Sequence, residues 1–219
     1  WWLLPAVVGA IALVLVIVSV ALPLQIAAAA GESGRSGAGA LLRQLPPVFW
    51  VFILIVALYG LCETIFGNWA TIYLHQDKGL SMQRASLALA AFWAMVTVGR
   101  VVAASGWIPV RWIYVGSPAL ILLAFVAIPR VEGTVASVAA FGLAGLACAA
   151  FFPLSISFAQ KACASMVAFV SGAMIAAYQV GYGLGAFGPG LLRAAGGFDL
   201  SSIYTAAGAF AAMLIALAW

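Results

Sequence analysis

The sequence predicts an all-α integral membrane protein, a helical bundle of about seven transmembrane helices, from three observations. Hydrophobic residues make up 67% of the 219 residues and charged residues only 6%, whereas about 25% of a soluble domain is charged. The mean hydropathy is +1.21. Apolar segments close to the roughly 20 residues needed to cross the hydrocarbon core of a bilayer recur along the chain. A soluble fold of this size cannot bury so much apolar surface, so we expect the lipid bilayer to be its solvent.

Each apolar segment is expected to be a helix, because backbone groups in lipid must form hydrogen bonds within their own segment. The segments lack the alternating pattern of membrane β-strands and are longer than such strands, which excludes a β-barrel. Short polar turns, such as "HQDKGLS" and "RVEGT", separate the last six segments. In chain order, the predicted helices are Trp2–Ala30, Val48–Leu74, Arg84–Ala104, Arg111–Pro129, Val135–Gln160, Val167–Leu192 and Ser201–Trp219.

A Gly/Ser-rich stretch divides the chain into three predicted parts. Residues 1–30 form a transmembrane helix of a preceding bundle, residues 31–47 a linker loop, and residues 48–219 a six-helix bundle. The loop contains Arg35 and Arg43, and a small excess of basic residues on its side of the bilayer places it in the cytoplasm. The first residue is Trp1 and the chain ends in an apolar run, so we expect a longer protein with an N-terminal half that precedes this sequence.

Glu63 is the first candidate functional residue, because it lies inside an otherwise apolar predicted helix. A carboxylate in a bilayer is costly, so an intramembrane acid is expected to face a cavity, a proton path or a cation. Tyr59 lies one helical turn earlier on the same face. The alternative is a structural hydrogen bond to a neighbouring helix. Asn68 lies roughly 140° around the helix from Glu63, and it suits a ligand contact or a helix–helix hydrogen bond equally well.

The sixth predicted helix supplies a second group of candidates. Tyr178 and Tyr182 lie one turn apart, and Gln179 is a polar residue within the same apolar segment. Gly181 and Gly185 form a GxxxG motif, which lets two helices approach closely or slide. Two interpretations remain open for this helix: tight packing alone, or a mobile helix with Tyr178, Gln179 and Tyr182 as substrate contacts.

Proline and arginine residues point to a kink and a gate. Pro153 lies inside the fifth predicted helix and is expected to kink it, with Ser155 and Ser157 as substitute hydrogen-bond donors. Arg100 lies in the last turn or so of the third predicted helix (Arg84–Ala104), and Arg111 begins the next. Arg100 either caps its helix or contacts lipid phosphates, or it closes a cytoplasmic gate by pairing with an acid on another bundle.

Several classes of function lack support in the sequence. There is no GxSxG, HExxH or Walker motif, so we expect no enzyme. The three cysteines, Cys62, Cys148 and Cys163, have no CxxC or His–Cys spacing, so we expect no metal site, disulfide or cofactor. The net charge of +4 is scattered rather than clustered, so we expect no nucleic-acid partner.

The motifs resemble those of the major facilitator superfamily. "YGLCETIFGNWATIYL" (Tyr59–Leu74) resembles the seventh helix of its fucose-permease-like sugar branch, in which an acid and a tryptophan recur as in Glu63 and Trp69. "FWAMVTVGR" (Phe92–Arg100) resembles the eighth helix, and "AAFFPLSIS" (Ala149–Ser157) the tenth. Residues 48–219 would then be the C-terminal half. The superfamily's loop signature is not intact here, and only Gly99, Arg100 and Arg111 resemble remnants of it.

The resemblance implies a secondary active transporter in the inner cell membrane that works by alternating access between two six-helix halves. The expected substrate is a small solute, sugar-like or another metabolite, with a proton as the coupling ion. Glu63 would bind substrate or the proton, and Arg100 would belong to the cytoplasmic gate. The alternatives are a drug or metabolite exporter of the same superfamily, and a membrane receptor or assembly subunit that transports nothing.

Overall fold

The structure, a computed structural model, describes residues 7, 9–10, 13–14, 17–18 and 45–219. The chain divides into two units, Trp1–Leu45 and Pro46–Trp219. In the first unit the described positions between residues 7 and 18 are helical and exposed, and Leu45 is buried in a bend. Most of the first predicted helix (1–30) and linker residues 31–44, including Arg35 and Arg43, lie outside the described residues. The fold and the candidate site that follow concern the second unit alone.

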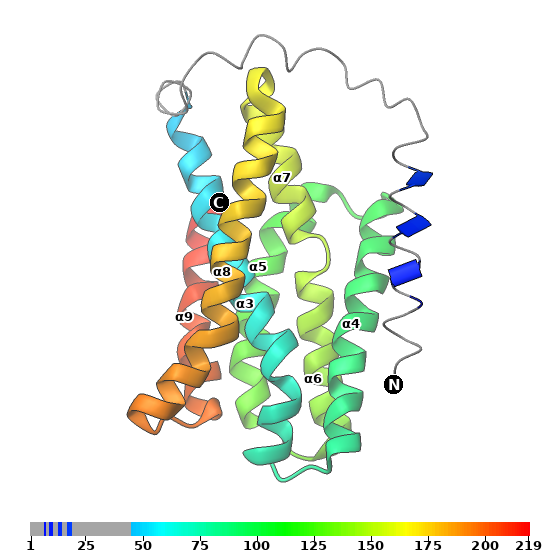
Figure 1. The fold of residues 1–219 in the computed structure, drawn as a ribbon, viewed down its shortest axis with the longest axis vertical. Helices are drawn as coiled ribbons and strands as arrows, with labels where there is room; N and C mark the ends of the chain where they lie inside the picture. Colours follow the sequence, from blue (N-terminus) through cyan, green and yellow to red (C-terminus); the bar gives the residue numbers. More distant parts are fainter. Residues whose placement is uncertain (1–6, 8, 11–12, 15–16, 19–44) are drawn as a thin grey trace. The chain divides into compact units, whose positions relative to one another are not determined.

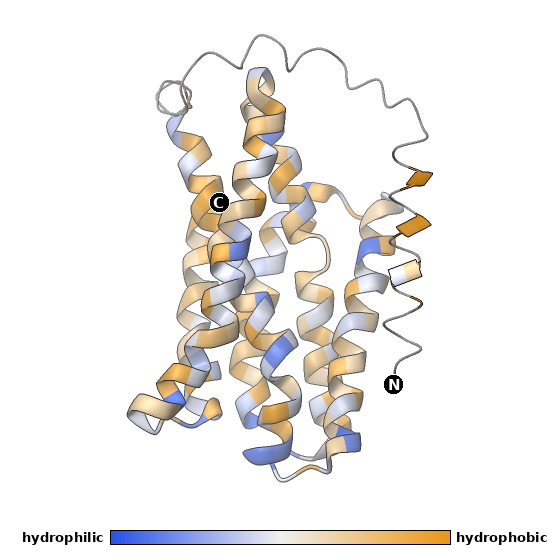
Figure 2. Ribbon diagram, in the orientation of Figure 1, coloured by the Kyte–Doolittle hydropathy of each residue, from blue (hydrophilic) through white to orange (hydrophobic). Residues whose placement is uncertain are grey.

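Pro46–Trp219 contains six helical segments that are long and apolar enough to cross a membrane, and no strand occurs among its residues (Figure 1). This part of the chain is therefore a helical bundle of a multi-pass membrane protein. Figure 2 shows hydrophilic residues mainly near the helix ends, with a few inside the bundle. The elements are α3 (Pro47–Gln76), α4 (Met82–Ala104), α5 (Val110–Ala127), η3 (Ile128–Arg130), α6 (Gly133–Cys148), α7 (Phe151–Ala162), η4 (Ala164–Met166), α8 (Val167–Gly196) and α9 (Leu200–Ala218).

Local sequence signals set several helix ends. The Ser81 side chain accepts a hydrogen bond from the backbone N–H of Arg84, so α4 begins two residues before its predicted start. Asp199 caps α9 in the same way, accepting from the backbone N–H of Ser202 at 3.0 Å. α8 ends at Gly196, and Gly197 after it has a φ of 65°, the left-handed conformation that glycine tolerates.

Three helix pairs organise the bundle: α3 packs on α8, α4 on α6, and α5 on α9. Glycines allow the closest approaches in the first two pairs. A Cβ added to Gly185 of α8 would lie 2.7 Å from the carbonyl oxygen of Leu61 in α3, and one added to Gly181 would lie even closer to the Ala57 carbonyl. In the second pair, a Cβ on Gly145 would collide with the backbone of α4. Small residues thus bring whole backbones into contact, as is typical of membrane helices.

The fifth predicted helix is broken rather than kinked. α6 ends at Cys148, and α7 begins at Phe151, after a turn at residues 149–150 (Figure 1). Pro153 is the third residue of α7, a position that needs no intrahelical N–H donor. Proline has no N–H, so it cannot donate to the Ala149 carbonyl four residues earlier. The break therefore follows from Pro153, and it leaves carbonyl groups in mid-span that need other donors.

Candidate functional site

Glu63 lies at the contact between α3 and α8. It is buried, with 6% of its surface exposed, and the Tyr178 hydroxyl donates a hydrogen bond of 2.7 Å to its Oε2 atom. Gly60 makes this contact possible, because a Cβ at position 60 would lie 2.5 Å from the Tyr178 carbonyl oxygen. The only acid inside a described span is therefore shielded from lipid and joined to a second helix by a phenol.

Tyr59, one turn before Glu63, connects the same face of α3 to the helix break. It is buried, and its hydroxyl donates a 2.7 Å hydrogen bond to the carbonyl oxygen of Cys148, the last residue of α6. The Phe152 ring lies parallel to the Tyr59 ring, with centroids 6.3 Å apart, and 4.5 Å from the Tyr178 ring. Phe152 of α7 thus packs against both Tyr59 and Tyr178.

Arg100 bonds to the second carbonyl group at the helix break, that of Ala149. Its Nε atom donates a 3.2 Å hydrogen bond to the Ala149 oxygen, the group that Pro153 leaves without a helical partner. Ser155 does not fill this place, because its hydroxyl bonds to Phe151 within α7. The predicted serine donors are therefore replaced at the break by Tyr59 and Arg100, which come from two other helices.

A second set of polar groups lies along the α3–α8 contact. Trp69 donates from Nε1 to the carbonyl oxygen of Gly185 at 3.0 Å, and the Asn68 amide reaches the exposed Tyr182 hydroxyl at 3.4 Å. Gln179 is exposed on α8. Both Glu63 and Asn68 therefore reach tyrosines of α8, although they point in different directions around α3.

Among the described residues, Arg100 and Arg111 form no ion pair, and an acid on another bundle lies outside these residues, so the gate stays a prediction. Arg111 is exposed at the start of α5, and Arg100 bonds to a backbone carbonyl. Within the described part of the chain, the recorded ion pair joins Arg193 to Asp77, 3.6 Å apart, where α8 and α3 end. No group of three or more possible metal ligands occurs among the described residues.

Sequence reasoning missed three parts of this site: Phe152, Gly60 and the carbonyl groups at Cys148 and Ala149. Pro153 was the available signal for the Ala149 carbonyl, since a proline within a helical segment cannot donate to the carbonyl four residues before it. The Phe152 contact and the close approach at Gly60 depend on how helices pack, which one helix's pattern does not reveal. Comparison of the chain with protein-family models, curated proteins and solved structures finds no match.

Proposed function

We propose that the chain is the C-terminal six-helix half of a secondary active transporter of the major facilitator type, in which Glu63 carries the coupling proton. The carboxyl group of Glu63 at the α3–α8 contact is the observation that carries this proposal. An acid inside the membrane region is typical of proton paths and transport sites. The six spans and the broken α6–α7 segment also fit a transporter, since interrupted helices commonly supply polar groups at mid-membrane.

The burial of Glu63 favours a proton over a substrate as its ligand. With 6% of its surface exposed, the residue offers little area to a solute, and its carboxylate is already bonded to Tyr178, which packs against Phe152. As a carboxylate, Glu63 accepts a hydrogen bond from the Tyr178 hydroxyl. When Glu63 carries the proton on Oε2, that atom becomes a donor, and the Tyr178 hydroxyl must turn to accept. Protonation of Glu63 would thereby reverse the hydrogen bond that joins α3 to α8.

Substrate would bind on the exposed side of the contact between α3 and α8. Asn68, Gln179 and Tyr182 supply amide and hydroxyl groups there, which suit a small solute with hydroxyl groups, sugar-like or another metabolite. Tyr178 bonds to Glu63 and lies one turn from Tyr182. A turn of the Tyr178 hydroxyl would therefore couple the protonation state of Glu63 to the substrate side of α8. We propose that Arg100 stabilises the helix break between α6 and α7. We also place Arg100 and Arg111 on the cytoplasmic side of the six-helix half.

The rival function is a membrane protein that transports nothing and uses Glu63 to join helices. The hydrogen bond between Glu63 and Tyr178 favours this function too, because it joins two helices directly. An exporter of the same type would differ from an importer only in the direction of flux. The test must therefore measure flux and stability on the same variants.

The test compares Glu63→Gln with Glu132→Gln in proteoliposomes that contain the full-length protein. Glu132 is an exposed acid that makes no side-chain cap at the start of α6, so it is the matched control. With candidate solutes, we expect proton-driven uptake in the control and its loss in Glu63→Gln, while exchange of labelled for unlabelled solute persists. Unchanged proton-driven uptake in Glu63→Gln, or loss of stability with no flux in any variant, would contradict the proposal.

A further inference from the structure

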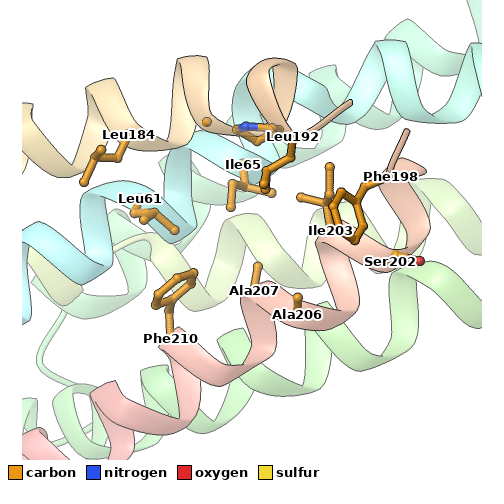
Figure 3. Close-up of a pocket in the computed structure, with 12 residues that line it drawn as sticks. Leu61, Ile65, Leu184, Leu192, Phe198, Ser202, Ile203, Ala206, Ala207 and Phe210 are labelled. Carbon is orange, nitrogen blue, oxygen red and sulfur yellow. The ribbon is translucent and has the colours of Figure 1, made fainter. Parts of the chain in front are cut away.

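A groove on the opposite side of the α3–α8 contact is independent of the Glu63 cluster. Its cavity volume is about 490 Å³, within the range typical of small-molecule sites. Leu61 and Ile65 of α3 form its floor, and α8 and α9 form its two walls (Figure 3). Leu184 and Leu192 lie on the α8 wall.

The α9 wall combines the large side chains of Ile203 and Phe210 with small ones that leave space between them. Ala206 and Ala207 line the groove beside Phe210. Ser202 is the sole polar residue of the lining and lies towards one end, near Phe198 (Figure 3). An apolar cavity does not hold water. Because all three helices are membrane spans, the medium available to fill it is hydrocarbon.

Charged groups of both signs lie at the end of the spans where Ser202 is found. The Ser202 N–H donates to the Asp199 carboxylate at 3.0 Å, which ties this acid to the groove lining. Hydrogen bonds from Ser202, and beyond them the nearby Arg193 guanidinium, lower the pKa of the Asp199 carboxyl below its ordinary 3.8, so it is charged at neutral pH. Arg193 follows the groove residue Leu192 and is partly exposed, with 31% of its side-chain surface open.

This charge pattern selects among lipid headgroups. Asp77, paired with Arg193, and Asp199 give two negative charges, and Arg193 and the neighbouring Lys78 give two positive charges. Lys78 donates a hydrogen bond to the Pro129 carbonyl in η3. A headgroup with only a phosphate would offer no cation to Asp199. One that carries a phosphate and a primary ammonium group would match Arg193 and Asp199 together.

We propose that the α3–α8–α9 groove binds one acyl chain of a zwitterionic phospholipid, whose phosphate contacts Arg193 and whose ammonium group contacts Asp199. Bulk lipid is as apolar as the groove, so the acyl chain alone gives little preference for the site. The preference comes from the headgroup. A hydrogen bond to a charged group is commonly strong enough for about a tenfold difference in affinity.

Native mass spectrometry of the full-length protein with added phosphatidylethanolamine or phosphatidylglycerol tests the proposal. We expect one bound phosphatidylethanolamine, preferred about tenfold over phosphatidylglycerol. Ala206→Phe fills the groove and should remove this adduct. Ala209→Phe is the matched control, because Ala209 is exposed on the same helix and does not line the groove. Asp199→Asn keeps a capping side chain and should abolish the preference between the two lipids.

Three results would overturn the proposal. In the first, Ala206→Phe binds phosphatidylethanolamine as the wild type does. In the second, phosphatidylglycerol binds as well as phosphatidylethanolamine, or better, in the wild type. In the third, the protein forms a dimer that Ala206→Phe dissociates while lipid binding does not change, which would identify a second helix as the occupant. If Ala206→Phe fails to fold, the lipid preference of Asp199→Asn still decides.

Discussion

Replacing Gly185 by alanine tests whether backbone contact between α3 and α8 holds the candidate site together. The added Cβ would lie 2.7 Å from the Leu61 carbonyl oxygen and 2.9 Å from the Cβ of Thr64. Real Cβ atoms essentially never approach within 3.0 Å and ordinary contact begins at 3.4 Å, so α8 and Leu61 must move apart by about 0.3–0.7 Å. The obstacle is backbone, which cannot turn aside as a flexible side chain would.

The cost of this movement is about 1–3 kcal/mol, the usual range for overpacking a well-packed contact. Alanine also favours the helix over glycine by up to about 1 kcal/mol, which partly offsets the steric cost. Gly183→Ala isolates the two effects. Gly183 lies in the same helix, but an added Cβ there meets nothing within 4 Å. The difference in unfolding free energy between the two variants is therefore the steric cost alone.

The assay is unfolding of the purified full-length protein in mixed detergent micelles, followed by far-ultraviolet circular dichroism. We expect Gly183→Ala to be as stable as the wild type or slightly more stable. Gly185→Ala should be less stable than Gly183→Ala by about 1–3 kcal/mol. Gly181→Ala should be the least stable, because its added Cβ would approach the Ala57 carbonyl oxygen more closely still.

The same displacement should reach the Glu63 cluster. Trp69 donates to the Gly185 carbonyl, and Tyr178 lies two turns earlier on α8, so both hydrogen bonds to α3 would stretch. We therefore expect Gly185→Ala to reduce transport as well as stability. Equal stability of Gly185→Ala and Gly183→Ala would refute the reasoning, since it would mean that the two backbones do not touch.

Three further predictions concern single hydrogen bonds. Tyr59→Phe leaves the Cys148 carbonyl at the helix break without its buried donor, and detergent unfolding should show a loss of about 1–3 kcal/mol. Trp69→Phe removes a partly buried bond to Gly185, so the same measurement should show a smaller loss, about 0.5–1.5 kcal/mol. In the folded protein, hydrogen bonds from Ser202 lower the pKa of the Asp199 carboxyl below its ordinary 3.8. The charged carboxylate therefore stabilises the fold fully above pH 3.8, and this stabilisation is lost as the pH falls through the lower pKa of the folded state. Thermal unfolding of the wild type should therefore show an acid-dependent loss of stability that Asp199→Asn lacks; identical pH profiles would contradict this.

The sequence predicted the helical membrane bundle because a bilayer restricts the possible backbone structures so strongly. An apolar segment in lipid must satisfy its own backbone groups, so composition and length lead directly to helices. The predicted helix starts also lie close to the observed ones, as at α9, predicted from Ser201 and observed from Leu200, whereas α8 continues to Gly196, four residues beyond its predicted end. The first predicted helix, within residues 1–30, is not part of the described bundle and stays a prediction.

The candidate site was only partly predictable. The pattern on α3 placed Tyr59 and Glu63 on one face, and the GxxxG pattern on α8 indicated close packing at Gly181 and Gly185, where α3 does lie. The pattern alone left open whether Glu63 faces a cavity or another helix, because both choices hide it from lipid.

The sequence by itself determined which segments are helices, where most of them end, and which residues are too polar for lipid. The tertiary structure alone decided their partners: Tyr178 for Glu63, Cys148 for Tyr59 and Ala149 for Arg100. The physical reason is the range of the forces involved. Backbone hydrogen bonding and contact with lipid act within one segment, whereas each of these side-chain bonds joins residues at least 49 positions apart and depends on how closely glycines let two helices pack.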